Sequence, residues 1–409
     1  MQNALSHITV LDLSRVLAGP WAGQVLADFG ADVIKIERPG TGDDTRSWGP
    51  PFMRDAAGHE NTKADAAYFL CANRNKKSVT VDFTTSAGRE IVQQLACRAD
   101  VVLENFKVGG LAAYGLDYDS LKALNPRLIY CSITGFGQTG PYAARPGYDF
   151  LVQAMGGLMS ITGRGADEVG AGPQKAGVAV TDILTGLYAV IGMLTALAHR
   201  DRTGEGQHID LSLLDVQVAC LANQAMNYLV SGAVPKRLGN AHPNIVPYQD
   251  FPTQDGFMII AVGNDTQFAR LCAAVQLGEL AVDPRFATNQ ARVAHRVTLI
   301  DALSATTRTR TTAEWVAALE TAGVPCGPIN AIDAVFADPQ VRARQMRIEL
   351  PHPTSGTVPL VANPLRLSQT PPTYRSAPPT LGAHTLEVLR ERLGLSEADF
   401  GRLRAGGVI

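Results

Sequence analysis

The sequence predicts an α/β fold in which a doubly wound domain with a parallel sheet is joined to a smaller α+β domain. Strand and helix patterns alternate three times within the first 137 residues, and the pattern changes after about Thr203. The length of 409 residues also favours two domains or a discontinuous one, because single cores stop growing at about 250–300 residues.

The start of the chain reads as strand, helix and strand. An apolar strand spans residues 8–14, a helix with apolar residues at helical spacing follows at 19–30, and a second strand covers 31–37. A helix that connects two such strands indicates a parallel pair. The pattern returns at 78–106 and again at 117–137, which favours a doubly wound sheet.

The second half of the chain has a different pattern. Residues 203–232 read as a turn, a short strand and a long apolar helix, and residues 238–265 as loop, strand, turn and strand. Residues 265–325 are mainly helical and end at the stop signals Gly323 and Pro325. We therefore expect the smaller domain at about 225–325.

Composition excludes several classes of protein. The net charge is -2 with no run of like charges, so we expect neither nucleic acid nor a membrane as a partner. Charged residues make up 18%, below the usual ~25%, which indicates that a partner subunit covers part of the surface. The six cysteines lack metal-ligand or CxxC spacing, and residues 1–14 do not resemble a signal peptide. These features predict a cytoplasmic protein without a metal site.

One carboxylate stands out in the apolar stretch "AGVAVTDILTGLYAVIG". Asp182 is the only Asp, Glu, Lys or Arg between Lys175 and Arg200. It could cap a helix, pair with a cation or serve as a nucleophile. The segment 178–198 is long enough to span a membrane, but a charge there is costly, so we expect a buried core helix.

Four further stretches carry polar groups at the predicted strand ends, where an α/β sheet binds ligands. Arg38 ends the second strand and suits a phosphate, although a salt bridge to Glu37 or Asp43 fits equally well. The other stretches are "NRNKKSVTVDF", "ENFKVGGLAAYGLDY" and "SITGFGQTGPYAARPGYDF". In "NRNKKSVTVDF" the cations Arg74, Lys76 and Lys77 could face either a phosphate or water. No GxGxxG follows the first strand, which disfavours a nicotinamide oxidoreductase.

Several long stretches of this sequence resemble the class III coenzyme A (CoA) transferases of the CaiB/BaiF type. They are the stretches just quoted, together with "VLDLSRVLAGPWAGQVLADFGADVIKIERPGTGD", "GRGADEVGAGPQKAGVAVTDILTGLYA" and "AEWVAALETAGVPCGPINAIDAVFADPQVRAR". That family includes formyl-CoA, carnitine and dicarboxylate CoA-transferases. The resemblance implies a Rossmann-like CoA domain at 1–200 plus 330–409, a small domain at 225–325, linkers at 201–224 and 326–350, and an interlocked homodimer.

The resemblance also implies roles for individual residues. Asp182 matches the family nucleophile, which forms an aspartyl mixed anhydride and then an aspartyl-CoA thioester. No metal or cofactor is expected, because the CoA thioester is itself a substrate. The positions that match CoA contacts are Arg15, Val16, Leu17, Ala18, Arg38, Val81, Asp82, Asn105, Phe106, Lys107, Arg145, Tyr148 and Asp149.

The sequence departs from the family pattern at two places. A family arginine falls at Ala113, so Lys107 or Arg145 is expected to supply that charge. The glycine run that covers the site in formyl-CoA transferase is replaced by "GNAHPNIVP", where Gly239, Asn240 and His242 are candidate acid contacts. A second carboxylate on the substrate would need a cation such as His242, Lys236 or Arg237.

Two alternatives remain beside the transferase. Racemases on this fold carry a histidine where this chain has Tyr148, and a phenol with an ordinary pKa near ~10 is a poor base at pH 7. A CoA-binding protein without turnover would not need Asp182. The motif variants look closest to transferases that use succinyl-CoA with a dicarboxylic acid such as glutarate, itaconate or malate.

Overall fold

The structure is a computed structural model that describes residues 3–55, 57–59, 61–165 and 168–409. Ala166 and Asp167, inside one stretch that carries the family resemblance, lie outside these described residues. The chain forms two compact units. The larger unit holds residues 1–157, 176–225 and 342–409, and the smaller holds 158–175 and 226–341. The division drawn from the sequence differs in three places: it gives 158–175 and 330–341 to the larger domain, and it treats 201–224 as a linker, whereas the structure places 201–224 in the larger unit.

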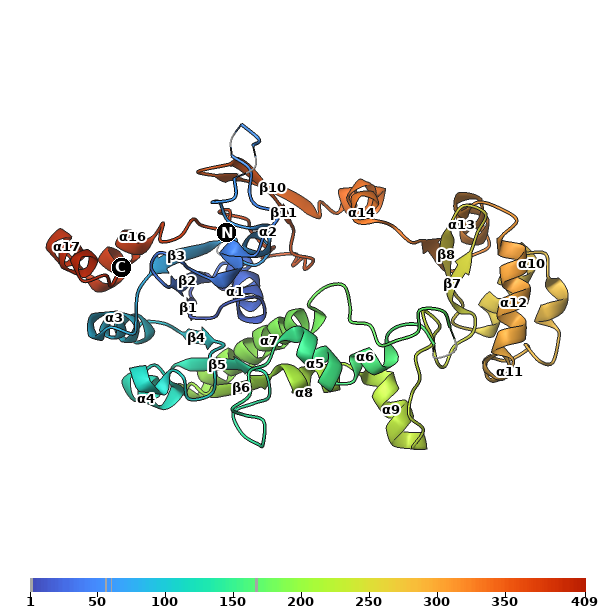
Figure 1. Ribbon diagram of the computed structural model, residues 1–409, viewed down its shortest axis with the longest axis horizontal. Helices are drawn as coiled ribbons and strands as arrows, with labels where there is room; N and C mark the ends of the chain where they lie inside the picture. The colour runs from blue at the N-terminus through green and yellow to red at the C-terminus, as the bar shows by residue number, and fades with distance from the viewer. Residues whose placement is uncertain (1–2, 56, 60, 166–167) are drawn as a thin grey trace. The chain divides into compact units, whose positions relative to one another are not determined.

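A parallel sheet of six strands forms the centre of the larger unit (Figure 1). Its strand order is β3-β2-β1-β4-β5-β6. All five neighbouring pairs are parallel, as the repeated strand–helix pattern predicts. The strand order reverses between β1 and β4, which makes the carboxyl ends of these two strands the expected ligand crevice. The strands are β1 (Thr9–Asp12), β2 (Asp32–Glu37), β3 (Lys76–Thr80), β4 (Val101–Glu104), β5 (Ile129–Thr134) and β6 (His208–Ser212).

Helices cover both faces of this sheet, and each face has its own apolar core. Strand residues are apolar on both sides, as a parallel sheet between two helix layers requires. Val102 packs on one face and Val101 and Leu103 on the other. One layer consists of α3 (Ser86–Ala96), α4 (Tyr118–Leu124), α16 (Thr385–Leu393) and α17 (Glu397–Ala405). The other consists of α1 (Ala18–Asp28), α5 (Asp149–Met155), α7 (Val180–Thr203) and α8 (Leu213–Ala219).

Helix α7 contains the apolar stretch around Asp182. Among the described residues it is the one helix whose length and composition would allow it to cross a membrane. One side of α7 packs on α1, β5 and β6, with Ala189 and Met193 fully buried. Leu187 and Ile191 on another side are exposed. The expected core helix is therefore buried along one side only.

The smaller unit is built around a three-stranded antiparallel sheet of order β7-β8-β9. Its core contains Phe268, Leu299 and Trp315 from the helices that pack on this sheet. The strands are β7 (Tyr248–Pro252), β8 (Phe257–Ala261) and β9 (Cys326–Pro328). The helices are α10 (Asp265–Ala274), α11 (Asn289–Ala294), α12 (Arg296–Thr307) and α13 (Thr312–Thr321).

Short elements make up the rest of the described chain. Strands β10 (Arg347–His352) and β11 (Gly356–Val361) form an antiparallel pair. The short helices are η1 (Asp44–Ser47), α2 (Ala67–Leu70), η2 (Ala112–Tyr114), α6 (Leu158–Ile161), α9 (Ala222–Ser231), η3 (Gly278–Ala281), α14 (Ile332–Ala337) and α15 (Pro339–Ala343).

Candidate active site

Asp182 lies in the first turn of α7, where that helix meets α1. Its side chain is 9% exposed and lines a cavity. Gly186, one turn further along, allows the close contact: a Cβ there would come within 2.7 Å of the carbonyl oxygen of Ala18. The tight packing brings the start of α7 beside the segment that leads into α1.

Asp149, rather than Asp182, caps helix α7. Its Oδ1 accepts hydrogen bonds from the backbone N–H of Thr181 at 2.8 Å and of Asp182 at 3.3 Å. Gln153 Nε2 donates to its Oδ2 at 2.6 Å. Asp149 therefore fills the capping role that the sequence left open for Asp182. Within the described chain, nothing donates a hydrogen bond to the Asp182 carboxylate, so its oxygens are available to a reactant.

Burial raises the pKa of Asp182 to about 7, and the charge of Asp149 contributes to the rise. A helix N-terminus favours a negative charge, but burial outweighs that effect here. A carboxylate with a pKa near 7 is half ionised at neutral pH and more basic than an ordinary aspartate. The site therefore offers a reactive carboxylate at physiological pH.

Residues 15–18 form one wall of the cavity, and two polar side chains hold them. The side chain of Asn105 accepts from the N–H of Arg15 at 2.8 Å and donates to its carbonyl at 2.6 Å. Asp43 accepts from the N–H of Val16 at 3.3 Å. Val16 has φ 72°, a left-handed conformation that is strained for a β-branched residue. Such strain is typical of ligand-binding segments.

The loop after β5 forms another part of the cavity wall. Gly135 and Gly147 touch through their backbones, since a Cβ on Gly147 would lie 2.3 Å from the Cα of Gly135. This contact folds the loop back so that Arg145 and Tyr148 line the cavity. The Arg145 guanidinium lies 4.6 Å from the ring centre of Tyr142.

The cavity has a volume of about 510 Å³ and collects most of the predicted CoA contacts. An adjoining cavity of about 300 Å³ shares Arg15 and Phe106 with it and is lined by Arg38, Val81 and Asp82. The predicted residues in the first cavity are Arg15, Val16, Leu17, Ala18, Asn105, Phe106, Lys107, Arg145, Tyr148 and Asp182. Arg15 follows β1 and Asn105 follows β4, so both cavities lie at the reversal of strand order.

Asp149 is the predicted CoA contact that the structure places elsewhere. The sequence puts it beside Tyr148 in the loop, but successive residues at the start of a helix point in different directions. Tyr148 is 63% exposed, whereas Asp149 is buried against the start of α7. Asp149 therefore contacts the start of α7 and influences Asp182 from there.

The cations near the strand ends divide into two groups. Arg38 forms no ion pair with any described residue, because Glu37 is paired with Arg46 and Asp43 with Lys35. The salt bridge that the sequence left open for Arg38 is therefore absent, and its guanidinium remains available to a phosphate.

The cations of "NRNKKSVTVDF" are structural. Arg74 and Lys76 are buried and pair with Asp28 at 2.6 Å and with Asp12 at 3.0 Å. Lys77 lies near Asp32, at 3.5 Å. The sequence suggested a phosphate contact or a solvated loop, and neither interpretation is correct for the buried Arg74 and Lys76. The sequence does not distinguish cations that face solvent or a ligand from cations that pair with acidic residues. The fold identifies their acidic partners.

The candidate acid contacts Gly239, Asn240 and His242 lie in the smaller unit. His242 accepts a hydrogen bond from the N–H of Asn244 at 3.1 Å, and Arg237 Nε donates to the carbonyl of Arg164 at 3.1 Å. These contacts belong to the smaller unit itself.

Sequence reasoning missed several groups at the site. Burial and the charge of Asp182 raise the pKa of Tyr68 to about 12, so this phenol lies within electrostatic range of the carboxylate. Asp43 supports Val16, and Glu104 precedes the Asn105 turn. Asp43 and Glu104 stand inside the quoted motifs, but Tyr68 has no sequence signal. The described residues contain no cluster of three or more His, Cys, Asp and Glu placed to hold a metal.

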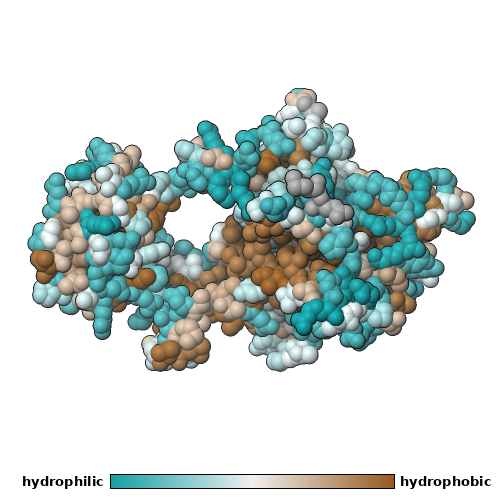
Figure 2. Space-filling view, turned by 180° about the vertical axis from the view of Figure 1, so that it is seen from behind, coloured by the Kyte–Doolittle hydropathy of each residue, from teal (hydrophilic) through white to brown (hydrophobic). Residues whose placement is uncertain are grey.

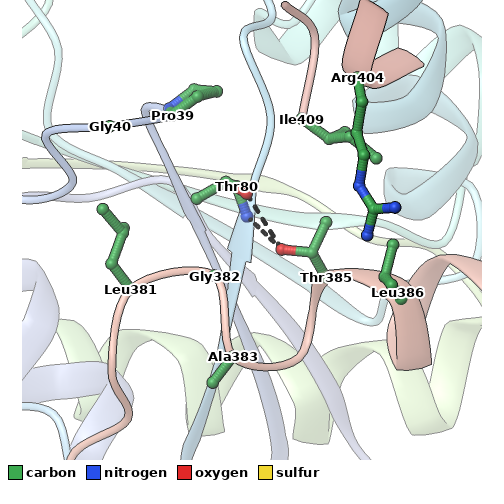
Figure 3. A pocket seen from close by; sticks show the side chains of 10 residues that line it. All are labelled: Pro39, Gly40, Thr80, Leu381, Gly382, Ala383, Thr385, Leu386, Arg404 and Ile409. Carbon is green, nitrogen blue, oxygen red and sulfur yellow. Dashed lines mark hydrogen bonds between the residues drawn. The ribbon is translucent and has the colours of Figure 1, made fainter. Parts of the chain in front are cut away.

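A further cavity of about 450 Å³ lies between the ends of β2 and β3 and the C-terminal segment (Figure 3). Thr80 and Thr385 are hydrogen-bonded there, with the Thr80 N–H donating to Thr385 Oγ1 at 2.9 Å. Arg404 and Ile409 approach it from the C-terminus. None of the residues predicted from the sequence as site residues lines it, so it is not part of the candidate active site.

Comparison with known proteins agrees with this geometry. The family model described as CoA-transferase family III matches residues 5–385. The chain belongs to CoA-transferase family III. It is therefore an enzyme of that family, as the sequence motifs predict.

Individual family III relatives are similar over nearly the whole chain. A succinate–glutarate CoA-transferase from Agrobacterium fabrum is 57% identical over 387 residues, covering 95% of each protein. A human succinyl-CoA:glutarate CoA-transferase is 44% identical over 405 residues, covering 99% of this chain and 90% of the relative. The crystal structure of a CAIB/BAIF family protein from Brucella suis has a TM-score of 0.84 at 52% identity, covering 96% of this chain and 100% of that one.

Proposed function

We propose that this enzyme transfers CoA between succinyl-CoA and a dicarboxylic acid of the glutarate class through a covalent intermediate on Asp182. The observation that carries the proposal is the Asp182 carboxylate, which lines the cavity and accepts no hydrogen bond from the described residues. The names of the similar relatives support the choice of succinyl-CoA and glutarate.

The first half of the proposed cycle loads CoA onto the enzyme. An oxygen of the Asp182 carboxylate attacks the carbonyl carbon of the donor thioester. The C–S bond breaks, and the CoA thiolate departs with its electron pair to leave a mixed anhydride. The thiolate then attacks the aspartyl carbonyl carbon of that anhydride. The donor acid leaves as a carboxylate, and Asp182 carries CoA as a thioester.

The second half reverses these steps with another acid. The acceptor carboxylate attacks the aspartyl thioester carbonyl, which expels the CoA thiolate and forms a second mixed anhydride. The thiolate attacks the acceptor's acyl carbon, and Asp182 leaves as a free carboxylate. Each step exchanges a carboxylate and a thiolate with no net transfer of protons. The cycle therefore calls for no metal or redox cofactor.

The cavity residues fit the parts of an acyl-CoA. Lys107 and Arg145 line the cavity with Asp182 and Arg38 lines the adjoining one, so these cations are suited to the CoA phosphates. We propose that Lys107 or Arg145 supplies the charge that is missing at Ala113. We keep Gly239 and Asn240, with His242, as candidate contacts of the acid. We place the reaction in the cytoplasm, where the six free cysteines stay reduced.

The acid specificity gives a direct test of this proposal. With succinyl-CoA as donor, glutarate is expected to react with a kcat/KM at least about tenfold above that of valerate, because a site built for a second carboxylate rejects an analogue without it. Valerate is the matched control, since it keeps the five-carbon chain. Mass spectrometry of the acyl-CoA products measures both rates, with itaconate and malate in the same panel. Equal rates for glutarate and valerate, or no transfer from succinyl-CoA, contradict the proposal.

We further propose that the enzyme works as an interlocked homodimer. Exposed apolar side chains follow one side of α7 and continue onto α5: Leu187, Tyr188, Ile191 and Leu194, then Phe150, Leu151 and Met155. Apolar residues also gather over the middle of the larger unit on the face shown in Figure 2. Contiguous apolar surface of this kind is typical of subunit interfaces.

Ile191→Asp is expected to convert the dimer into monomers, because it buries a charge in the apolar contact. Light scattering coupled to size-exclusion chromatography measures the mass. Leu124→Asp is the matched control: Leu124 is 52% exposed on α4, on the opposite face of the sheet, and its replacement should leave the dimer intact. A monomeric wild-type protein contradicts this proposal.

A further inference from the structure

A third cavity of about 360 Å³ lies beside the one that contains Asp182, on the other side of the turn at residues 105–107. Lys107 and Val108 line both cavities. Glu104, Ser132 and His208 line the third cavity from three adjacent strands. The proposed reaction leaves these three side chains without a role.

The three side chains lie side by side on the sheet and interact with one another. Glu104 and Ser132 are partners in the β4–β5 register, and the Ser132 hydroxyl favours the ionised form of the Glu104 carboxyl. Ser132 Oγ lies 2.9 Å from His208 Nε2. An ionised Glu104 can only accept a hydrogen bond. The His208 ring is held by stacking on Tyr118, with ring centres 4.9 Å apart.

Glu104 is also linked to the wall of the CoA cavity, through Phe106 and Asn105 in the turn that follows it. Glu104 Oε2 accepts from the backbone N–H of Phe106 at 2.7 Å, which fixes the turn after β4. Asn105 in that turn clamps Arg15 through two hydrogen bonds. The strained Val16 follows. The Glu104 carboxyl therefore helps to hold residues 15–18, the cavity wall that these hydrogen bonds keep in shape.

Glu104 is buried, and its protonation changes in the neutral range. Burial raises its pKa to about 7, while the Ser132 hydroxyl and the Phe106 N–H oppose the rise. Burial lowers the pKa of His208, opposed by the charges of Asp210 and Asp119. The charged and titratable groups around Glu104 are Lys107 from the turn, Asp117, Tyr118 and Asp119 at the start of α4, Tyr130 and Cys131 from β5, and His208 and Asp210 from β6.

We propose that Glu104, Ser132 and His208 form a positioning relay that holds the CoA cavity in its binding shape when Glu104 is ionised and loosens it when Glu104 is protonated. A charged acceptor makes a stronger hydrogen bond to the Phe106 N–H than a neutral one. CoA affinity should therefore rise with pH through the neutral range. This inference rests on the proposed role of the cavity as the CoA site.

The test measures the Kd of CoA in two variants, Asp182→Asn and the double variant Asp182→Asn with Glu104→Gln. The shared Asp182→Asn change removes the titration of Asp182. Titration of the CoA phosphate, with a pKa of about 6, is common to both and cancels in their ratio. At about pH 6 the two variants should bind CoA equally, because Glu104 is then mostly protonated and, like glutamine, carries no charge. At about pH 8.5 the double variant should bind about fivefold more weakly, because it lacks the charged acceptor.

Ser132→Ala in the Asp182→Asn background provides a second reading. Losing the hydroxyl removes a donor to the ionised carboxyl, so the midpoint of the pH dependence should move to higher pH. A ratio between the Glu104 variants that stays constant with pH, or no shift with Ser132→Ala, overturns the relay. Loss of all CoA binding in the Asp182→Asn enzyme overturns the proposed CoA site itself, and the relay with it.

Discussion

Asp182→Asn is expected to lower CoA transfer by at least about 10³-fold, because the amide cannot form the anhydride. CoA affinity should change by less than about threefold, since the substitution keeps the side-chain shape and the proposed phosphate contacts lie elsewhere. Initial rates with succinyl-CoA and a CoA-binding titration separate the two effects. An enzyme that keeps its activity contradicts the nucleophilic role of Asp182.

Two controls accompany that measurement. Asp201→Asn changes an exposed carboxylate near the other end of α7 and should leave the rate unaltered. The Asp182→Asn protein should have a higher Tm than the wild type at about pH 8, because it no longer buries a carboxylate whose pKa is raised by burial. A lower Tm would indicate that Asp182 stabilises the fold.

Substitutions of Asp149 are expected to separate its charge from its hydrogen bonds. In Asp149→Asn the amide oxygen can still accept from the N–H groups of Thr181 and Asp182, but the negative charge is lost. The pKa of Asp182 should fall, because one of the two causes that raise it is removed. The acid side of the pH profile of kcat/KM, which reflects ionisation of Asp182 near pH 7, should therefore move to lower pH.

Asp149→Ala removes the acceptor as well and should have a larger effect. The start of α7 loses its cap, at about 1–2 kcal/mol of stability, and a displaced Asp182 should lower kcat by about 10- to 100-fold. The pH dependence of kcat/KM and thermal unfolding of both variants measure these effects. An unchanged acid limb in Asp149→Asn contradicts the coupling of the two carboxylates.

The parts of the fold that follow local patterns could be predicted from the sequence. Apolar runs such as 31–37 became strands of the parallel sheet, because strand–helix alternation fixes both the elements and their parallel pairing. The strand-end motifs met at one crevice for the same reason. Knowing that Arg15 follows β1 and that Asn105 follows β4 is enough to place them together.

The rest depends on contacts between distant residues. Lys76 looks like a surface cation in the sequence, yet it is buried against Asp12, which lies 64 residues away. The cap of α7 comes from Asp149, 33 residues before Asp182. The sequence shows a carboxylate in a loop and the start of a helix, but it does not show that the two are in contact. Tyr68 was missed for the same reason, since only the fold brings α2 near the start of α7.

The central claim is that Asp182 becomes covalently acylated, and trapping the intermediate tests it most directly. Enzyme mixed with succinyl-CoA and treated with hydroxylamine should yield the hydroxamate of one aspartate, seen as a mass change on the peptide that contains Asp182. Asp182→Asn enzyme treated in the same way should show no such change. Modification of a different peptide, or turnover with no trapped adduct on Asp182, would contradict the account.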